Sequence, residues 1–345
     1  MAKAHSYKFC FGPWNLSPGQ DPYGPPTRAD RPFDWKLAQL KKHGFDAMMF
    51  HDDAAVPDID GKSHRQILNE AKALKKRLDG EGIAAEMVAP RLWFHPNTVD
   101  GAYTSNDPKH RQYAIDRSLT AIDIAKVLGT DILVLWLARE GTYIREAKNG
   151  RRSIERLVEA FDKMLAHDRK VRLAIEPKPN EPMDHAYLPT IGHALAIAQL
   201  TRDEKRVGCL IESAHAILAG IDPADEIDFA CAFGKLWSLH LNDQNGLKYD
   251  QDRPFGCTNL RSAFDQVRVL ERNAYGKNGE FVCFDVHPFR TTKEEHWMDH
   301  LVNSRRTFLR LVEKVRNFDE KAAQKLIAAR DYQALDQMVI EHLLG

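Results

Sequence analysis

The sequence has no excess of either charge, few cysteines and no long apolar run. Its 345 residues carry 49 Lys and Arg against 49 Asp and Glu, a formal net charge of +0 with neutral His. Such a balance offers no bulk field for a nucleic-acid backbone. Without a long uncharged apolar run we expect no membrane span. The first residues, MAKAHSYKFCFG, lack the apolar core of a secretion signal, so we expect no export.

The cysteines are too few and too scattered to form a disulfide framework, and no pair has zinc-ligand spacing. They are Cys10, Cys209, Cys231, Cys257 and Cys283. We expect reduced thiols that serve as small core residues in a cytoplasmic protein.

What the sequence does contain is an alternation of short apolar runs and longer amphipathic stretches. The apolar runs lie at 8–12, 46–50, 84–89, 131–136, 172–176, 207–212, 236–241 and 281–286. Helical patterns lie at 33–44, 63–80, 109–128, 151–167, 190–200, 223–233, 258–272 and 293–315. About eight strand–helix units in succession predict a closed (β/α)8 barrel. An open dinucleotide-binding sheet fits less well, because the first run leads into a Pro/Gly-rich loop without G-x-G-x-x-G.

The length suits one catalytic barrel domain followed by a short extension. We place the barrel at residues 1–318 and a C-terminal helical extension at 319–345. The extension is expected to contact another copy of the chain in an oligomer.

Acidic and imidazole side chains gather at the ends of the fifth to eighth predicted strands. They are Glu176, Glu212, His215, His240, Asp250, Asp252 and Asp285. Because the chemistry of such barrels sits at the carboxyl ends of the strands, we expect these side chains to meet at one rim. Crowded carboxylates repel each other and lose hydration, and Lys178 alone cannot offset five of them. The pattern therefore predicts bound divalent cations.

The mix of ligands indicates which cations these are. Carboxylates dominate, His is the minority and no Cys is placed to help, which favours Mg²⁺ or Mn²⁺, with Co²⁺ able to substitute. Seven candidate ligands are too many for one octahedral ion that also binds substrate. Two ions that share Glu212 as a bridging carboxylate fit better.

At these residues the chain resembles the xylose isomerase family, from about Phe9 to Phe318 and again at the C-terminal EHLLG. The matching motifs are FHDD (50–53), WLAREG (136–141), IEPKPNEP (175–182), E-x-x-H (212–215), GLKYDQD (246–252) and FD-x-x-P-x-RT (284–291). The resemblance implies a metal-dependent aldose–ketose isomerase that works by a 1,2-hydride shift. D-Xylose and D-glucose are the default substrates of the family.

The resemblance also implies two ion sites. The first would be held by Glu176, Glu212, His240 and Asp285. The second would be held by Glu212, His215, Asp250 and Asp252. At the first site His240 stands where xylose isomerases have a metal-ligating Asp, which is similar to L-rhamnose isomerase.

Further roles follow by matched position. Lys178 would donate a hydrogen bond to the carbonyl oxygen of the sugar, and His51 would assist opening of the sugar ring. Asp252 would hold a water that takes the proton of the sugar hydroxyl. The sugar would be contacted by Trp14, Trp93, Trp136, His287 and, from a neighbouring subunit, Tyr23. The family would make the protein a homodimer or homotetramer.

Several positions depart from the family pattern. Ala54 replaces the Asp that orients the ring-opening histidine, which leaves the tautomer of His51 unfixed unless Asp53 substitutes. Ala89, Arg91, Met183 and His287 also differ, around the substrate. The preferred sugar therefore stays open.

Three other functions stay open. Related barrels epimerise or isomerise ketoses by proton transfer through an enediol. Others cleave phosphodiesters at abasic DNA sites, although a balanced charge speaks against nucleic acid as a partner. A binding-only paralogue is the third, although both sets of metal ligands are filled.

Overall fold

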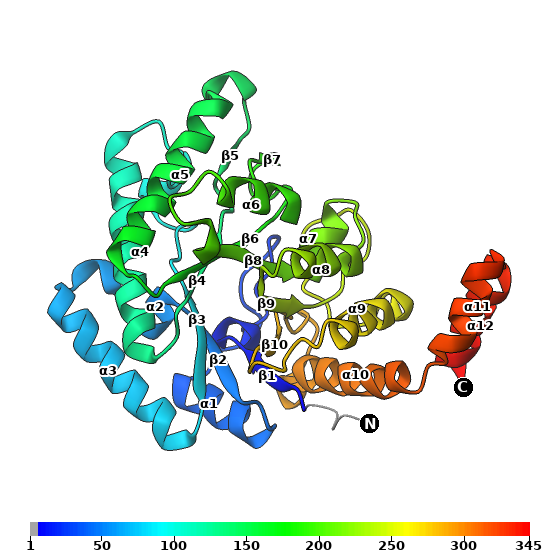
Figure 1. Ribbon diagram of the computed structural model, residues 1–345. Helices are drawn as coiled ribbons and strands as arrows, with labels where there is room; N and C mark the ends of the chain where they lie inside the picture. Colours follow the sequence, from blue (N-terminus) through cyan, green and yellow to red (C-terminus); the bar gives the residue numbers. More distant parts are fainter. Residues whose placement is uncertain (1–5) are drawn as a thin grey trace.

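The computed structural model describes residues 6–345 and forms a closed barrel of eight parallel strands (Figure 1). Around the barrel the order is β1-β10-β9-β8-β6-β4-β3-β2. The strands are β1 (Lys8–Phe11), β2 (Ala47–His51), β3 (Ala84–Ala89), β4 (Ile132–Trp136), β6 (Arg172–Glu176), β8 (Val207–Glu212), β9 (Leu236–Leu241) and β10 (Phe281–Phe284). They coincide with the eight predicted runs, so the (β/α)8 architecture is confirmed. Residues 1–5 of the expected barrel domain lie outside the described residues.

Helices surround the barrel and follow the predicted amphipathic stretches closely (Figure 1). They are α1 (Phe33–Lys42), α3 (His64–Glu81), α4 (Pro108–Leu128), α5 (Gly150–His167), α6 (Ile191–Ala198), α8 (Pro223–Ala232), α9 (Leu260–Arg272) and α10 (Asp299–Arg316). Local sequence sets their ends: Ser63 and Gln66 form a capping box before α3, and Gly129 ends α4 in the left-handed region.

One predicted helix, 293–315, begins later than expected. A short 3-10 turn, η6 (Glu294–His296), precedes it, and α10 starts only at Asp299. Between them the chain turns inward to bury Trp297, whose ring lies 5.5 Å from the Arg28 guanidinium and 5.3 Å from that of Arg31. Burial of this ring outweighs the helical preference of the flanking residues.

The sequence patterns missed the shortest elements, which are too short to show a period. These are α2 (Asp52–Ala55), α7 (Ser213–Leu218), the antiparallel pair β5 (Gly141–Thr142) and β7 (His185–Ala186), and the 3-10 turns η1 (Pro13–Leu16), η2 (Ile59–Gly61), η3 (Pro96–Thr98), η4 (Arg145–Ala147) and η5 (Glu204–Arg206). Two of them matter for the site, because α2 and α7 begin directly at the carboxyl ends of β2 and β8.

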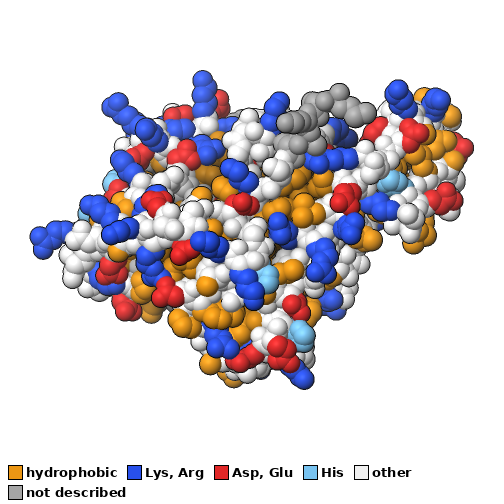
Figure 2. Space-filling model, turned by 90° about the horizontal axis from the view of Figure 1, so that it is seen from below, with side chains coloured by type: hydrophobic (Ala, Val, Ile, Leu, Met, Phe, Trp, Pro, Cys, Tyr) orange, Lys and Arg blue, Asp and Glu red, His pale blue; other side chains and the backbone are white. Residues whose placement is uncertain are grey.

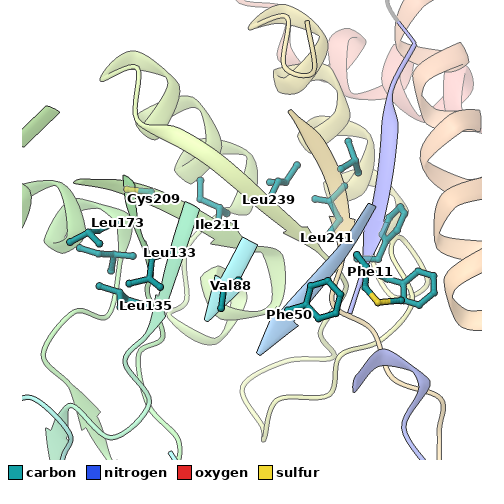
Figure 3. Packing of buried hydrophobic residues seen from close by; sticks show 14 of the residues in the cluster. Phe11, Phe50, Val88, Leu133, Leu135, Leu173, Cys209, Ile211, Leu239 and Leu241 are labelled. Atoms are coloured by element: carbon teal, nitrogen blue, oxygen red, sulfur yellow. The ribbon is translucent and has the colours of Figure 1, made fainter. Parts of the chain in front are cut away.

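Alternate residues along each strand enter two separate apolar clusters. The larger cluster joins the strands to the surrounding helices; Figure 3 shows part of it, with Phe50, Leu133 and Leu241 among the labelled residues. The smaller one, with Met49 and Val134, fills the barrel interior. This period of two is what lets the polar residues at the strand ends point into the barrel mouth.

The cysteines match their expected role in part. Cys10, Cys209 and Cys283 are buried, as predicted, whereas Cys231 is half-buried and Cys257 is exposed. All five are free thiols.

The C-terminal segment forms two helices that lie beyond α10, away from the barrel (Figure 1). They are α11 (Glu320–Ala329) and α12 (Tyr332–Leu344). His342 of α12 contacts the Lys314 carbonyl oxygen at 2.7 Å through Nε2 and packs against the Phe318 ring. That this segment contacts another copy stays a prediction.

Two observations concern the membrane and nucleic acid, which the sequence did not favour as partners. No helix within residues 6–345 is long and apolar enough to cross a membrane. On the face shown in Figure 2, basic and acidic side chains are interspersed.

Candidate active site

A cavity of about 430 Å³ opens at the carboxyl ends of the barrel strands. Every predicted site residue except Tyr23 lines it: Trp14, His51, Trp93, Trp136, Glu176, Lys178, Glu212, His215, His240, Asp250, Asp252, Asp285 and His287. Its size lies in the range of small-molecule sites. The rule that barrel chemistry sits at the carboxyl ends of strands therefore located the cavity correctly.

The barrel strands deliver the acidic and imidazole groups from adjacent positions. Glu176 ends β6 and Glu212 ends β8, and Glu212 pairs in register with His240 of β9. His215 lies in α7, three residues after Glu212, so the first turn of that helix brings its ring back over the strand end. Asp285 directly follows β10.

Three groups of potential ligands meet in the cavity, and all three contain Glu212. They are Glu176 with Glu212 and His215, Glu212 with His240 and Asp285, and Glu212 with Asp250 and Asp252. Within each group the candidate ligand atoms lie within 4.8 Å of one another. Glu212 is thus common to all three groups, while Glu176 groups with His215 rather than with His240 and Asp285; that Glu212 bridges two ions stays a prediction.

The His240 imidazole has the geometry of a ligand rather than of a hydrogen-bonding residue, whereas His215 Nε2 lies 3.0 Å from Asp250 Oδ2. Nδ1 of His240 lies 3.7 Å from Glu176 Oε1, 3.8 Å from Glu212 Oε2 and 3.8 Å from Asp285 Oδ2, all too long for hydrogen bonds. Ligand atoms about 2.1 Å from one octahedral ion lie roughly 3–4 Å apart. The spacing around His240 therefore fits an ion at the centre of this group.

Several buried polar atoms support the same conclusion. Both ring nitrogens of His240, Nδ1 of His215 and Oδ1 of Asp250 have no hydrogen-bond partner among the described residues. Buried polar atoms without partners are costly and rare, so each calls for an explanation. Oxygen-rich donors with two imidazoles suit Mg²⁺, Mn²⁺ or Co²⁺, and the residues present fit such cations.

The electrostatics of the cluster show why charge compensation is needed. Burial, and then the charges of Asp250, Asp285 and Asp252, raise the pKa of Glu212 well above its ordinary value. Burial and the Asp250 charge likewise raise the pKa of Asp252 to about 6. Without cations these carboxylates, which are buried or half-buried, repel each other.

Lys178 offsets one of these charges directly. Its Nζ lies 2.8 Å from Asp250 Oδ2 and 3.2 Å from Glu181 Oε2, beneath the face of Trp136 at 5.1 Å. Burial opposes the charge of Lys178, but Asp250 and Glu181 raise its pKa above the ordinary value. Although burial also opposes the charge of Asp250, Lys178 and then His215 hold the pKa of that carboxyl far below its usual range.

Glu181 is a site residue that the sequence reasoning missed. Its carboxylate accepts the backbone N–H of Asp250 at 3.0 Å in addition to pairing with Lys178. Its position in the EPKPNEP motif was visible, but nothing local indicated that it reaches the loop after β9. The neighbouring Met183 is buried and does not line the cavity, contrary to expectation, because its carbonyl oxygen accepts the Glu181 N–H and folds the chain back.

Asn242 is the second residue that was missed, and it connects three of the ligand-bearing segments. Only 1% of it is exposed. Its Nδ2 donates to Glu212 Oε1 at 2.8 Å, to Asp252 Oδ1 at 3.2 Å and to the Asp285 carbonyl oxygen at 3.0 Å. Its Oδ1 accepts the Ala214 N–H at 2.7 Å. The only signal in the sequence was its place two residues after His240, just past the end of a strand.

The carboxylate of Asp285 is also held by neighbours from the first barrel segment. Trp14 Nε1 donates to its Oδ1 at 2.8 Å and Asn15 Nδ2 at 2.6 Å. These bonds leave Oδ2 free to face His240. Trp14 therefore supports the ligand set and also forms part of the cavity wall.

The predicted tryptophans form one wall of the cavity around His51. The His51 ring stacks on Trp14 at 4.1 Å, and Trp93 meets it edge-on at 5.1 Å. Trp93 in turn meets Trp136 at 4.5 Å. On the other side, Arg91 Nη2 lies 3.0 Å from His51 Nδ1.

The carboxylates after His51 do not take the place of the missing acceptor at Ala54. Asp52 is buried and is occupied by the Arg117 guanidinium and by the backbone N–H groups of Asp53 and Arg91. The Asp53 carboxylate lies 3.7 Å from Arg91 Nη1. Of the two alternatives left open by the sequence, the one in which Asp53 substitutes is not favoured, because Arg91 contacts Nδ1 of His51 instead.

His287 and Tyr23 complete the predicted set. His287 Nδ1 lies 2.8 Å from Asp252 Oδ2. Burial opposes the charged ring, but Asp252 raises the pKa of His287 to about 9. Tyr23 is 76% exposed and meets Tyr249 edge-on at 5.1 Å, and its role in a neighbouring subunit stays a prediction.

Known proteins share this architecture. A family model described as a xylose isomerase-like TIM barrel matches residues 37–273. A D-tagatose 3-epimerase-like protein matches 90% of this chain and 98% of its own, at 16% identity and a TM-score of 0.64. A xylose isomerase domain protein from Alicyclobacillus acidocaldarius matches 90% of this chain and 100% of its own, at 13% identity and a TM-score of 0.63. The IOLI protein, solved with a zinc atom, matches 89% of this chain and 99% of its own, at 15% identity and a TM-score of 0.61.

Proposed function

Because the chain belongs to the xylose isomerase-like TIM barrel family, we propose that it is a metal-dependent aldose–ketose isomerase that works by a 1,2-hydride shift. The observation that carries this proposal is the set of three ligand groups around Glu212, next to a protonated Lys178, in one cavity. Candidate substrates are D-xylose, D-glucose and other aldoses. The cavity of about 430 Å³ accommodates a sugar of this size.

Two cations would be held by two sets of side chains that have Glu212 in common. Glu176, Glu212, His240 and Asp285 would hold the first, and Glu212, His215, Asp250 and Asp252 the second. The chemistry that bound cations supply in such a site is polarisation of a carbonyl oxygen and acidification of the neighbouring hydroxyl.

The side chains of the protein supply the remaining steps. Lys178 donates a hydrogen bond to the carbonyl oxygen, where negative charge develops. Asp252 holds a water that takes the hydroxyl proton, and His51 acts on the ring of the cyclic sugar. The indole rings of Trp14, Trp93 and Trp136 exclude water from the migrating hydride.

A second candidate is epimerisation of a ketose by proton transfer through an enediol. It is favoured by the fold of the D-tagatose 3-epimerase-like protein. The second ligand group with Asp250 and Asp252 favours the hydride shift, because a one-ion epimerase has no need of it. The two reactions differ in where the transferred hydrogen comes from.

The test is a panel of aldoses assayed for ketose formation with Mg²⁺, Mn²⁺ or Co²⁺, before and after EDTA. We expect ketose from at least one aldose, loss of activity with EDTA and recovery with added cation. When the reaction is run in D₂O, a hydride shift leaves no deuterium on the carbon that receives the transferred hydrogen. Deuterium at that carbon would establish proton transfer, and absence of isomerisation from every aldose would overturn the proposal.

A further inference from the structure

The contact between Arg91 and His51 determines which nitrogen of the imidazole carries the hydrogen. Arg91 Nη2 lies 3.0 Å from His51 Nδ1. A guanidinium has only N–H donors and is not deprotonated in proteins. Nδ1 of His51 must therefore accept this hydrogen bond with its lone pair.

The imidazole is also neutral in this environment. Burial and then the charge of Arg91 hold the pKa of His51 well below its ordinary value, and His240 and His287 act in the same direction. A neutral ring whose Nδ1 accepts must carry its hydrogen on Nε2. His51 lines the cavity, and Nε2 is the ring nitrogen left for a ligand.

Arg91 is held in this position from several sides. Its guanidinium lies 3.7 Å from the Asp53 carboxylate and 5.3 Å from the centre of the Phe94 ring. Its backbone N–H donates to Asp52 Oδ1 at 3.0 Å. Position 54, where the resemblance implies an Asp that orients this histidine, has only a methyl group in this chain.

We propose that Arg91 is a positioning residue that fixes His51 as the Nε2–H tautomer, so that His51 donates a hydrogen bond to an oxygen of the bound sugar. The donor role rests on the proposed function, whereas the tautomer does not. A histidine oriented by a carboxylate at Nδ1 offers a lone pair at Nε2 and acts as a base. In this chain Nε2 of His51 instead presents an N–H donor to the ligand.

The tautomer is measured directly by ¹⁵N NMR of the full chain with labelled histidine and Mg²⁺. The chain has 15 His, and the signals of His51 are those lost in His51→Gln. We expect a pyridine-type Nδ1, coupled strongly to Hε1 alone, and a pyrrole-type Nε2, coupled to both ring hydrogens. A pyrrole-type Nδ1 in the wild type would overturn the proposal.

Two variants show whether Arg91 is responsible. Arg91→Met should shift His51 toward the Nδ1–H form, whereas Arg91→Lys, which keeps a donor, should preserve the wild-type pattern. Arg290→Met is the matched control, since Arg290 lines the same cavity and its guanidinium binds backbone carbonyl oxygens of Gly19 and Pro25. Arg290→Met should leave the His51 signals in place. An unchanged His51 pattern in Arg91→Met would contradict the assignment.

The donor role has its own test in kinetics. Glutamine places an N–H group near the position of Nε2, and asparagine does not reach it. On a cyclic aldose we expect the kcat of His51→Gln to exceed that of His51→Asn by about 10²-fold, the low end of acid–base contributions. On an aldose too short to cyclise, the two variants should be equal. Equal loss on the cyclic sugar would overturn the donor role, and absence of any isomerisation would overturn the proposed function while leaving the NMR result intact.

Discussion

Glu212 is the side chain on which both proposed ion sites depend. It is 3% exposed, and its carboxylate lies 3.3 Å from His215 and 3.8 Å from His240. Burial and three neighbouring carboxylates raise its pKa, so its charge is costly in the absence of cations. A residue retained at such a cost is best explained by ligation.

Glu212→Gln should remove cation binding and reduce turnover by at least about 100-fold. This is more than the loss caused by substituting a residue that only hydrogen-bonds to a metal ligand. The loss of one charge should leave the cation-free chain at least as stable in urea, because repulsion in the cluster falls. Calorimetric titration with Mn²⁺ and urea unfolding measure the two effects. Glu86→Gln is the control: Glu86 is equally buried, but its carboxylate accepts from Ser238 and does not line this cavity. Wild-type Mn²⁺ affinity in Glu212→Gln would remove Glu212 from the ligand set.

Lys178 has two possible roles that one substitution can separate. Lys178→Met should lower kcat by about 10²–10³-fold if the ammonium stabilises charge on the substrate oxygen. It also removes the 2.8 Å contact with Asp250, which should weaken binding of the second cation. We therefore measure kcat over a titration of cation concentration. If saturating cation restores the wild-type kcat, Lys178 only positions Asp250.

At the scale of the element, β8 carries Glu212 and packs tightly against the chain that enters β9. A Cβ added at Gly208 would lie 2.8 Å from the Lys235 carbonyl oxygen and 2.7 Å from the Trp237 ring. No other residue type fits without a shift of backbone.

Gly208→Ala should therefore destabilise the chain by about 1–3 kcal/mol, the cost of overpacking a well-filled region. Gly80→Ala, in α3 with no atom within 4 Å of the added Cβ, should instead stabilise it by about 0.5–1 kcal/mol. Urea unfolding of both variants measures the difference. Equal midpoints for the two would mean that the close approach of β8 to Lys235 is not rigid.

α10 is joined to the cavity segment by His300. Its Nε2 lies 2.7 Å from the Asn15 carbonyl oxygen, and burial is the main cause that lowers the pKa of His300 to about 3. The unfolded chain has the ordinary pKa of about 6.5 at this ring. The unfolded state therefore takes up a proton first as the pH falls, so the contribution of His300 to stability is present above pH 6.5 and is lost between about 6.5 and 3.

The free energy of unfolding should then fall with decreasing pH more steeply in the wild type than in His300→Gln, by up to about 1.4 kcal/mol per pH unit between pH 6 and 4. Glutamine keeps an N–H donor for Asn15 but does not titrate. Urea unfolding at several pH values provides the slopes. His185→Gln, at an exposed histidine, is the control and should keep the wild-type slope. Parallel slopes for His300→Gln and wild type would show that this ring does not couple stability to pH.

At the scale of the whole molecule, the closed barrel brings five carboxylates together at one mouth although the chain is neutral overall. Binding of cations to the folded state alone stabilises it by mass action, about 2.7 kcal/mol at a concentration 100 times Kd.

Mg²⁺, Mn²⁺ or Co²⁺ should therefore raise Tm by several degrees in a chain of this size, and EDTA should reverse the rise. Differential scanning calorimetry measures the shift, with Glu212→Gln as the variant expected to lose it. The same Tm with and without cation would mean that the carboxylates tolerate each other without ions, which would contradict the central premise of the proposed function.

The sequence by itself determined the barrel and the end of it at which the candidate ligands meet. A run such as AAEMVA predicts a strand because it is a short, mostly apolar stretch between two longer amphipathic ones, and it coincides with β3 at the same limits. The candidate ligands could be named because each stands at or just after the end of such a run, and parallel strands bring those ends to one rim.

The tertiary structure alone decided how those side chains are held. The hydrogen bond between Asn242 and Glu212 joins residues 30 positions apart in the sequence. The contact between Arg91 and His51 spans 40 positions, and the hydrogen bond between Trp14 and Asp285 spans 271. No local pattern carries such pairs, because backbone periodicity reports which face a residue occupies and not which distant side chain lies opposite it. For this reason the presence of His51 could be read from the motif FHDD, while the nitrogen that carries its hydrogen was decided only when the closed barrel brought Arg91 beside it.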